Sequence, residues 1–223
     1  MVRPIDVIPV IHNALRADMA AIDGEAFAAA RGTPGLILTE ERLRFFNEIL
    51  GFHAQGEELG IFPALEAVAP LVAASYAMEH RGLDNASLVL GDAISVHDKL
   101  RTARASAAFK FHLDLHLANE EAHLYPIFQE RVSVPDQAQA VRLMVGVLPP
   151  ERHPEFIAWM FPLLGNDDRE TMIRIWQMGM PEDIFAATIP LVRESIADSW
   201  GEVTRRIPEL EKQSSDPAQG APA

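Results

Sequence analysis

Apolar residues recur at helical spacing along almost the whole chain, and this pattern constrains the fold more than any other feature. Alternating runs of β-branched residues, which would indicate strands, are missing. Glycine and proline fall between long periodic segments, not at the close spacing typical of an all-β protein. Because 48% of the 223 residues are hydrophobic, a sizeable core can form. The sequence therefore predicts an all-α globular protein.

Turn signals divide residues 1–133 into four predicted long helices. The first spans residues 8–30 and ends at the glycine and proline of RGTPG. The second follows Thr39, its predicted N-cap, and runs to residue 69. Pro70 fits the first position of a third helix that runs to residue 94, and the fourth spans residues 98–131. Four long helices with short connections predict an antiparallel up-down four-helix bundle.

The rest of the chain differs in character. Residues 134–211 are predicted to form a smaller C-terminal helical extension, because proline and glycine divide them into shorter segments. This part carries three tryptophans and several methionines, which we interpret as core or docking surface and not as a cofactor site. Residues 212–223, KQSSDPAQGAPA, are polar and proline-rich and are predicted to form a disordered tail.

Charge and composition exclude several classes of function. The formal net charge is −13, and no cluster of lysine and arginine offsets it, so nucleic acid is not an expected partner. No apolar run reaches the roughly 18 to 20 residues of a membrane span, so we expect a cytoplasmic protein without a membrane partner. With no cysteine, any metal must be held by imidazole and carboxylate groups.

One eleven-residue motif occurs twice. HAQGEELGIFP at residues 53–63 and HLANEEAHLYP at residues 116–126 share histidine, paired glutamates, an aromatic residue and proline at the same offsets. Residues four apart lie on one face of a helix, so His53 with Glu57 and His116 with Glu120 each form a chelating pair. A duplicated helical hairpin that keeps the motif for packing alone is the structural alternative.

Two further histidines complete the predicted site. The first and third helices, which lack the motif, carry His12 and His80. Four inward imidazoles beside two carboxylates would be costly to bury without a cation. Six ligands are too many for a structural zinc site, which normally has four, but they suit two metal ions bridged by the glutamates. Iron is the preferred metal for this set, with manganese or zinc as other occupants.

This order of residues over residues 8–131 resembles the hemerythrin-like, or HHE cation-binding, family. The resemblance implies a non-haem di-iron centre, of a kind that can carry an oxo or hydroxo bridge, held by His12, His53, Glu57, His80, His116 and Glu120. It differs from the ferritin-like pattern, in which glutamate precedes histidine by three residues. Oxygen-carrying hemerythrins have two histidines four apart on the third helix, whereas here Asp84 follows His80 at that spacing. Asp84 is either a carboxylate ligand or a solvated residue, and the departure weakens the assignment as a carrier.

Several neighbouring residues have open roles at this point. His112 and His123 lie near the stripe of His116 and are either ligands or supporting donors, while Tyr76 either points into the site or packs in the core. Glu58 and Glu121 are better candidates for hydrogen bonds to the imidazoles or for salt bridges than for metal ligands. Each aromatic-proline step, Phe62-Pro63 and Tyr125-Pro126, is expected to kink its helix and close the end of the cavity, unless it serves packing alone. The end-of-helix histidines, His97 and His153, are expected at the surface.

The leading functional hypothesis is a di-iron protein that binds dioxygen or a related small ligand, such as nitric oxide or peroxide, for sensing, detoxification or storage. The first alternative is a di-iron oxidase or oxygenase with an organic substrate, whose pocket would be formed by the C-terminal helices. The second alternative is a metal-free helical interaction module.

Overall fold

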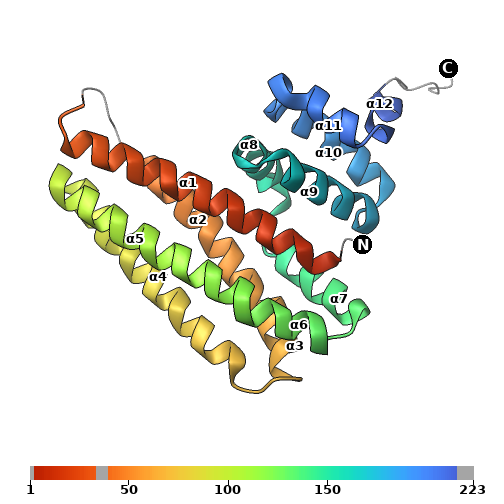
Figure 1. The fold of residues 1–223 in the computed structure, drawn as a ribbon, viewed down its shortest axis with the longest axis horizontal. Helices are drawn as coiled ribbons and strands as arrows, with labels where there is room; N and C mark the ends of the chain where they lie inside the picture. The colour runs from red at the N-terminus through yellow and green to blue at the C-terminus, as the bar shows by residue number, and fades with distance from the viewer. Residues whose placement is uncertain (1–2, 34–39, 215–223) are drawn as a thin grey trace.

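The computed structural model describes residues 3–33 and 40–214, and every regular element in this part of the chain is a helix. The four longest helices are α1 (Val7–Ala30), α2 (Glu40–Gly56), α4 (Val72–Ser95) and α5 (Lys99–Asn119). They lie side by side, and α1 and α4 each pack against both α2 and α5 (Figure 1). The all-α prediction is confirmed. No helix in the two described stretches is long and apolar enough to cross a membrane.

Both copies of the repeated motif contain a π-helical turn. Helix α2 continues through turn η2 (Glu57–Ile61) into α3 (Phe62–Glu66), and α5 continues through η3 (Glu120–Leu124) into α6 (Tyr125–Arg131). At the end of each turn the aromatic residue donates its N–H to the carbonyl five residues back, from Phe62 to Glu57 and from Tyr125 to Glu120. The proline that follows has no N–H to place in a normal helical bond. The interruption expected at these prolines is thus a wide turn inside a continuous helix.

The predicted boundary between the second and third helices is wrong. Helix α3 ends at Glu66, not at residue 69, and α4 begins at Val72, not at Pro70. The reason is Leu71, which adopts a left-handed conformation with φ 71° and so separates Pro70 from the helix. The carboxylate of Glu66 accepts the N–H of Leu71 at 2.9 Å and stabilises this turn. The predicted N-cap Thr39 lies outside the described residues.

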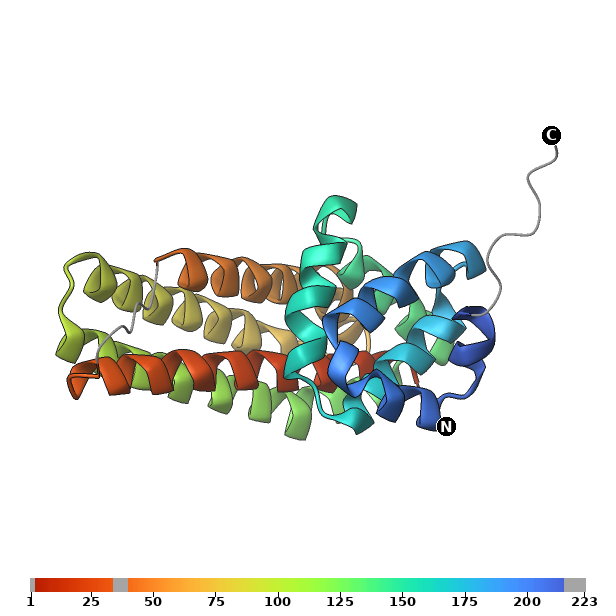
Figure 2. The same ribbon diagram turned by 90° about the horizontal axis from the view of Figure 1, so that it is seen from above.

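Six more helices follow. They are α7 (Val134–Val145), α8 (His153–Leu163), α9 (Asn166–Gly179), α10 (Glu182–Ser195), α11 (Trp200–Arg206) and α12 (Glu209–Ser214), with short 3-10 turns at Pro4–Asp6, Pro150–Arg152 and Ala197–Ser199. They gather at the end of the long helices where the chain begins (Figure 2), and α8 and α9 pack on α1. Helix α12 extends through residues 212–214, the first three residues of the predicted tail. The rest of the tail lies outside the described residues.

Two hydrophobic clusters make up the core. One contains Leu15 and Phe46 in the long helices. The other contains Ile8 of α1 and continues into the C-terminal helices through residues such as Met160 and Phe161. On α1, His12 lies between Ile8 of one cluster and Leu15 of the other. A buried polar layer therefore separates the two clusters.

Candidate metal centre

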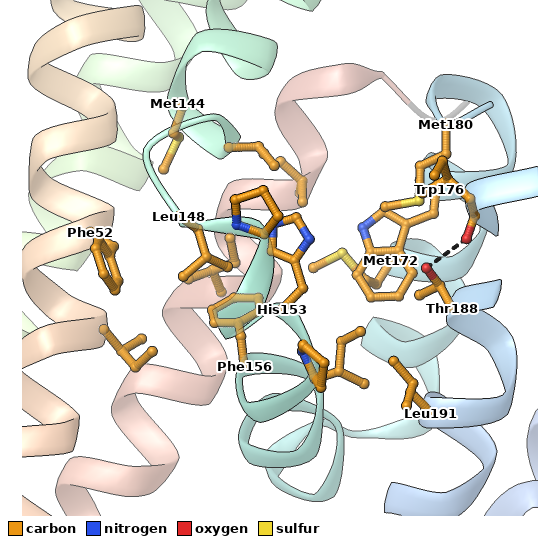
Figure 3. A pocket seen from close by; sticks show the side chains of 18 of the residues that line it. Phe52, Met144, Leu148, His153, Phe156, Met172, Trp176, Met180, Thr188 and Leu191 are labelled. Carbon is orange, nitrogen blue, oxygen red and sulfur yellow. Dashed lines mark hydrogen bonds between the residues drawn. The ribbon is translucent and has the colours of Figure 1, made fainter.

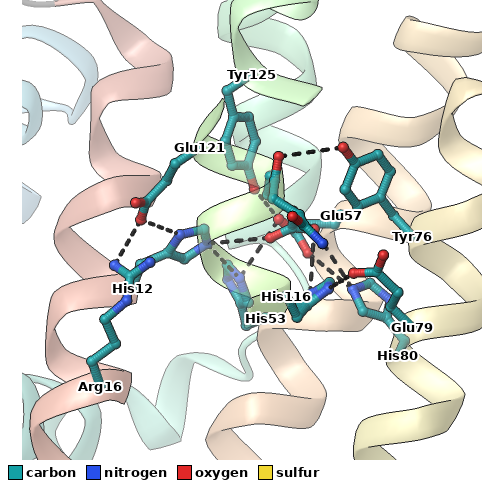
Figure 4. Close-up of polar contacts among 12 residues, drawn as sticks. His12, Arg16, His53, Glu57, Tyr76, Glu79, His80, His116, Glu121 and Tyr125 are labelled. Carbon is teal, nitrogen blue, oxygen red and sulfur yellow. Dashed lines mark hydrogen bonds and ion pairs between the residues drawn. The ribbon is translucent and has the colours of Figure 1, made fainter. Parts of the chain in front are cut away.

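The structure brings together the six side chains that the sequence singled out as ligands (Figure 4). They are His12 on α1, His53 on α2, Glu57 in η2, His80 on α4, His116 on α5 and Glu120 in η3. None is more than 5% exposed. Their donor atoms form two groups of four, each within 4.8 Å, and both glutamates belong to both groups. This arrangement suits two ions that share two carboxylates.

Four short contacts join the imidazoles to the carboxylates. The Nε2 atom of His53 lies 3.6 Å from Glu57, and that of His116 lies 3.4 Å from Glu120, so the two residues of each predicted pair lie close together. The contacts between helices are similar, with His80 Nε2 3.3 Å from Glu57 and His12 Nε2 3.6 Å from Glu120. Two ligands about 2.1 Å from one ion lie about 3.0–3.4 Å apart. The observed spacing is close to that range.

Three outer carboxylates hold the imidazoles in place. The Nδ1 atom of His12 bonds to Glu121 at 2.8 Å, and that of His80 bonds to Glu58 at 2.9 Å. In each case the second glutamate of a motif supports a histidine on a helix that lacks the motif, as the sequence predicted in general terms. An Nδ1–H that donates to a carboxylate leaves Nε2 unprotonated and free to bind a metal. The outer carboxylates therefore keep the Nε2 atoms that face the centre of the site available to bind a metal.

Sequence reasoning missed three contributors. Glu79 accepts a bond from His116 Nδ1 at 2.9 Å, and Arg16 donates to Glu121 at 2.8 Å. The hydroxyl of Tyr125, expected from the sequence only to close the end of the cavity, donates to Glu57 Oε1. Arg16 lies four residues after His12, so helical spacing already placed it on the same face. Glu79 precedes His80 by one residue and acts on a different helix, so no local pattern indicates its role.

Burial and neighbouring charges give the two central carboxylates opposite properties. Burial alone would raise the pKa of Glu57, but its contacts with His53 and His80 outweigh burial and lower its pKa to about 2. Burial raises the pKa of Glu120 well above its ordinary value, and repulsion from Glu57 adds to this effect. Glu57 accepts the bond from Tyr125, whereas neither carboxylate oxygen of Glu120 has a hydrogen-bond partner in the described structure.

The imidazoles are also shifted by burial. It lowers the pKa of His53 to about 3 and lowers that of His116 as well. Burial would also lower the pKa of His80, but its contacts with Glu57 and Glu58 more than offset that effect and raise it. At neutral pH the lowered pKa values keep His53 and His116 unprotonated, which is the form that binds metal ions.

Several buried polar atoms at the site have no hydrogen-bond partner among the described residues. They are His53 Nδ1, Glu57 Oε2, His80 Nε2 and both carboxylate oxygens of Glu120. A buried polar atom without a partner costs free energy, and a cation would engage all of these except His53 Nδ1. The donor set of four imidazoles and two carboxylates, without a thiolate, fits iron.

Four residues with open roles lie outside this cluster. Asp84, His112 and His123 are exposed and belong to neither group of four. Tyr76 is buried, but its hydroxyl donates to the carbonyl of Asn119 at 3.3 Å. His97 and His153 are exposed, as the sequence predicted.

Comparison with known proteins gives distant relatives. No protein-family model matches the chain. The chain is 27% identical over 178 residues to the Zinc finger protein BRUTUS of Arabidopsis thaliana, which is 77% of this chain and 14% of that protein. Two BRUTUS-like zinc finger proteins of the same plant are 22% and 21% identical, and the match covers 82% of this chain and 16% or 17% of theirs. No solved structure matches.

The chain thus spans about a sixth or less of the length of these relatives. Because it has no cysteine, it cannot form the cysteine-ligated zinc sites typical of zinc fingers. The similarity therefore concerns a part of those proteins that does not require a cysteine-ligated zinc site.

Proposed function

We propose that this chain is a hemerythrin-like four-helix bundle that holds two iron ions and binds dioxygen or a related small ligand, such as nitric oxide or peroxide. Glu57 and Glu120 would bridge the ions, with His12 and His53 on one and His80 and His116 on the other. The observation that carries the proposal is the pair of four-residue donor groups with both carboxylates in common. Sensing, detoxification and storage are the functions that such binding would serve.

The surrounding residues would prepare the site for that role. Glu58, Glu79 and Glu121 fix three imidazoles with Nε2 directed inward. The hydroxyl of Tyr125 holds Glu57 in place. Bound iron would supply redox chemistry and open coordination positions, because four protein donors do not complete the shell of an iron ion. Exposed Asp84 in place of a second histidine supports an open position on the ion beside His80.

The ligand proposal is tested by loading the protein with ferrous iron under nitrogen and recording absorption spectra while the gas is cycled between nitrogen and air. A band that appears in air and disappears under nitrogen is the expected result. Irreversible oxidation in air would contradict reversible binding of dioxygen and favour the oxidase alternative.

The metal site is tested in the same experiment with a matched pair of variants. His116→Ala removes a proposed ligand and should lose at least one iron per chain. His112→Ala, one turn earlier on α5 and exposed, should lose none. Equal iron contents in the two variants would refute the assignment.

A further inference from the structure

An apolar cavity of about 260 Å³ lies where α8, α9 and α10 meet α1 and α2 (Figure 3). Its walls include Phe52, Met144, Phe156, Trp176 and Met180. None of the described residues that line it is an aspartate, glutamate, lysine or arginine. Two lining residues, Val145 and Ile184, are 44% and 50% exposed, so the cavity reaches the surface. A small molecule from solution can therefore enter it.

The cavity shares one residue with the candidate metal centre. His53 lines the cavity and also belongs to one group of metal-binding donors. Its Nε2 atom faces His12 and Glu57, while its buried Nδ1 atom has no hydrogen-bond partner in the described structure. The other three imidazoles each bond through Nδ1 to a carboxylate. His53 is thus the exception in an otherwise regular arrangement.

The repeat indicates which residue would occupy the position of a supporting partner for His53. His116 is supported by Glu79, the residue immediately before His80. By the correspondence between the two halves of the site, the support of His53 would come from the residue immediately before His12. That residue is Ile11, which cannot accept a hydrogen bond and instead lines the cavity. The cavity therefore lies where the fourth supporting carboxylate would be expected.

We propose that this cavity binds a neutral, largely apolar organic molecule with an oxygen atom that accepts the Nδ1–H of His53. A cavity of 150 Å³ holds benzene, so 260 Å³ corresponds to about ten non-hydrogen atoms. We expect a neutral ligand because the described residues of the lining include no aspartate, glutamate, lysine or arginine to pair with a charge, and their polar side chains are those of His53, His153 and Thr188. Methionine and aromatic walls adapt to a flat ring. The hydrogen bond rests on the proposed metal function, because a metal ion bound at Nε2 would fix the proton of His53 on Nδ1. The cavity itself does not depend on the metal.

Three probes of matched size test the proposal by isothermal titration calorimetry, in metal-free and in iron-loaded protein. They are 4-methylacetophenone, which has a carbonyl oxygen, 4-ethyltoluene, which lacks it, and the anion 4-methylbenzoate. We expect one saturable site for the ketone in both forms of the protein. In the iron-loaded form the hydrocarbon should bind about two- to tenfold more weakly than the ketone. The anion should bind at least about tenfold more weakly than the ketone in both forms.

A matched pair of substitutions on α7 tests whether the ketone binds in this cavity. Val145→Trp fills the cavity from its half-exposed edge and should weaken binding of the ketone at least tenfold. Leu143→Trp, at a position 50% exposed and outside the cavity, should leave it unchanged. In metal-free protein the ketone should also shift the indole N–H resonance of Trp176 and not that of Trp200, which lies outside the cavity.

Several results would overturn the proposal. They are the absence of saturable binding in both forms, equal weakening by the two substitutions, and a Trp176 resonance that does not move. Loss of the ketone's advantage over the hydrocarbon in the iron-loaded form would overturn the hydrogen bond to His53. Failure of the proposed function gives a different result, in which the protein takes up no iron but the metal-free form still binds the ketone.

Discussion

Substituting glutamine for each central glutamate should change the stability of the metal-free protein in opposite directions. Glu120→Gln should stabilise it at pH 7, because Glu120 is buried with two oxygen atoms that lack partners and beside the charge of Glu57. Glu57→Gln should destabilise it, because Glu57 accepts a bond from Tyr125 and lies near His53 and His80. The two residues occupy equivalent positions in the repeat, so the contrast tests the electrostatics of the site.

The expected magnitudes follow from the environments of the two groups. Glu120→Gln removes a buried carboxylate that has no hydrogen-bond partner among the described residues, and this should raise the free energy of unfolding by about 1–3 kcal/mol. For Glu57→Gln at pH 7 we expect a loss of about 1–3 kcal/mol, because a neutral amide replaces the buried carboxylate that accepts the bond from Tyr125. In a chain of this size each kcal/mol changes the melting temperature by about 2–4 °C.

The two effects also depend on pH in opposite ways. A folded pKa above that of the unfolded chain makes stability fall as pH rises through the range between them, so the gain from Glu120→Gln should vanish below about pH 4. The stabilisation by Glu57, whose folded pKa is lowered, is complete above about pH 5 and is lost as pH falls toward about 2.

Urea unfolding of protein stripped with a chelator, followed by circular dichroism at several pH values, measures both effects. Glu130→Gln, an exposed change on α6, is the control and should stay within about 0.5 kcal/mol of the unmodified protein. Destabilisation by both central substitutions, to similar extents and at every pH, would refute the reasoning.

Three further predictions concern the surroundings of the site. Tyr125→Phe should lower the unfolding free energy of the metal-free protein by about 1.5–3 kcal/mol in urea unfolding, because it removes a hydrogen bond to a buried carboxylate. Unchanged stability would contradict that bond. Glu58→Gln should weaken iron affinity about 10–100-fold in competition with a chelator, since His80 loses its charged partner. An unchanged affinity would exclude this supporting role. Gly60→Ala should destabilise the fold by about 1–3 kcal/mol, because the new methyl group would collide with the carbonyl oxygen of Ala140. If this variant unfolded at the same urea concentration as the unmodified protein, α7 would have to shift away from the methyl group without loss of stability.

The close approach of the six side chains could be predicted because its signals are local. A histidine and a glutamate four residues apart lie on one face wherever a helix forms, and the two motif copies specify that spacing on α2 and α5. His12 and His80 could be found because each lies on a helix that lacks the motif, near the level that an antiparallel hairpin sets opposite the motif. These predictions needed only the helical period and an antiparallel arrangement.

The missed features depend on contacts between distant segments. The repeat has Gly56 and Gly60 in its first copy, where the second copy has Asn119 and His123. A side chain at either glycine would meet Met144 or Ala140 of α7, whereas His123 is exposed. Nothing in the repeat reveals that α7 packs closely on the glycines of the first copy. The left-handed turn at Leu71, which displaced the start of α4, likewise has no distinctive residue type to signal it.

The central claim is tested most directly by counting bound iron. Metal-free protein titrated with ferrous iron under nitrogen, desalted and assayed for metal should retain two ions per chain. Retention of no iron, or of one ion without a second at any concentration, would contradict a site in which Glu57 and Glu120 are shared by two ions.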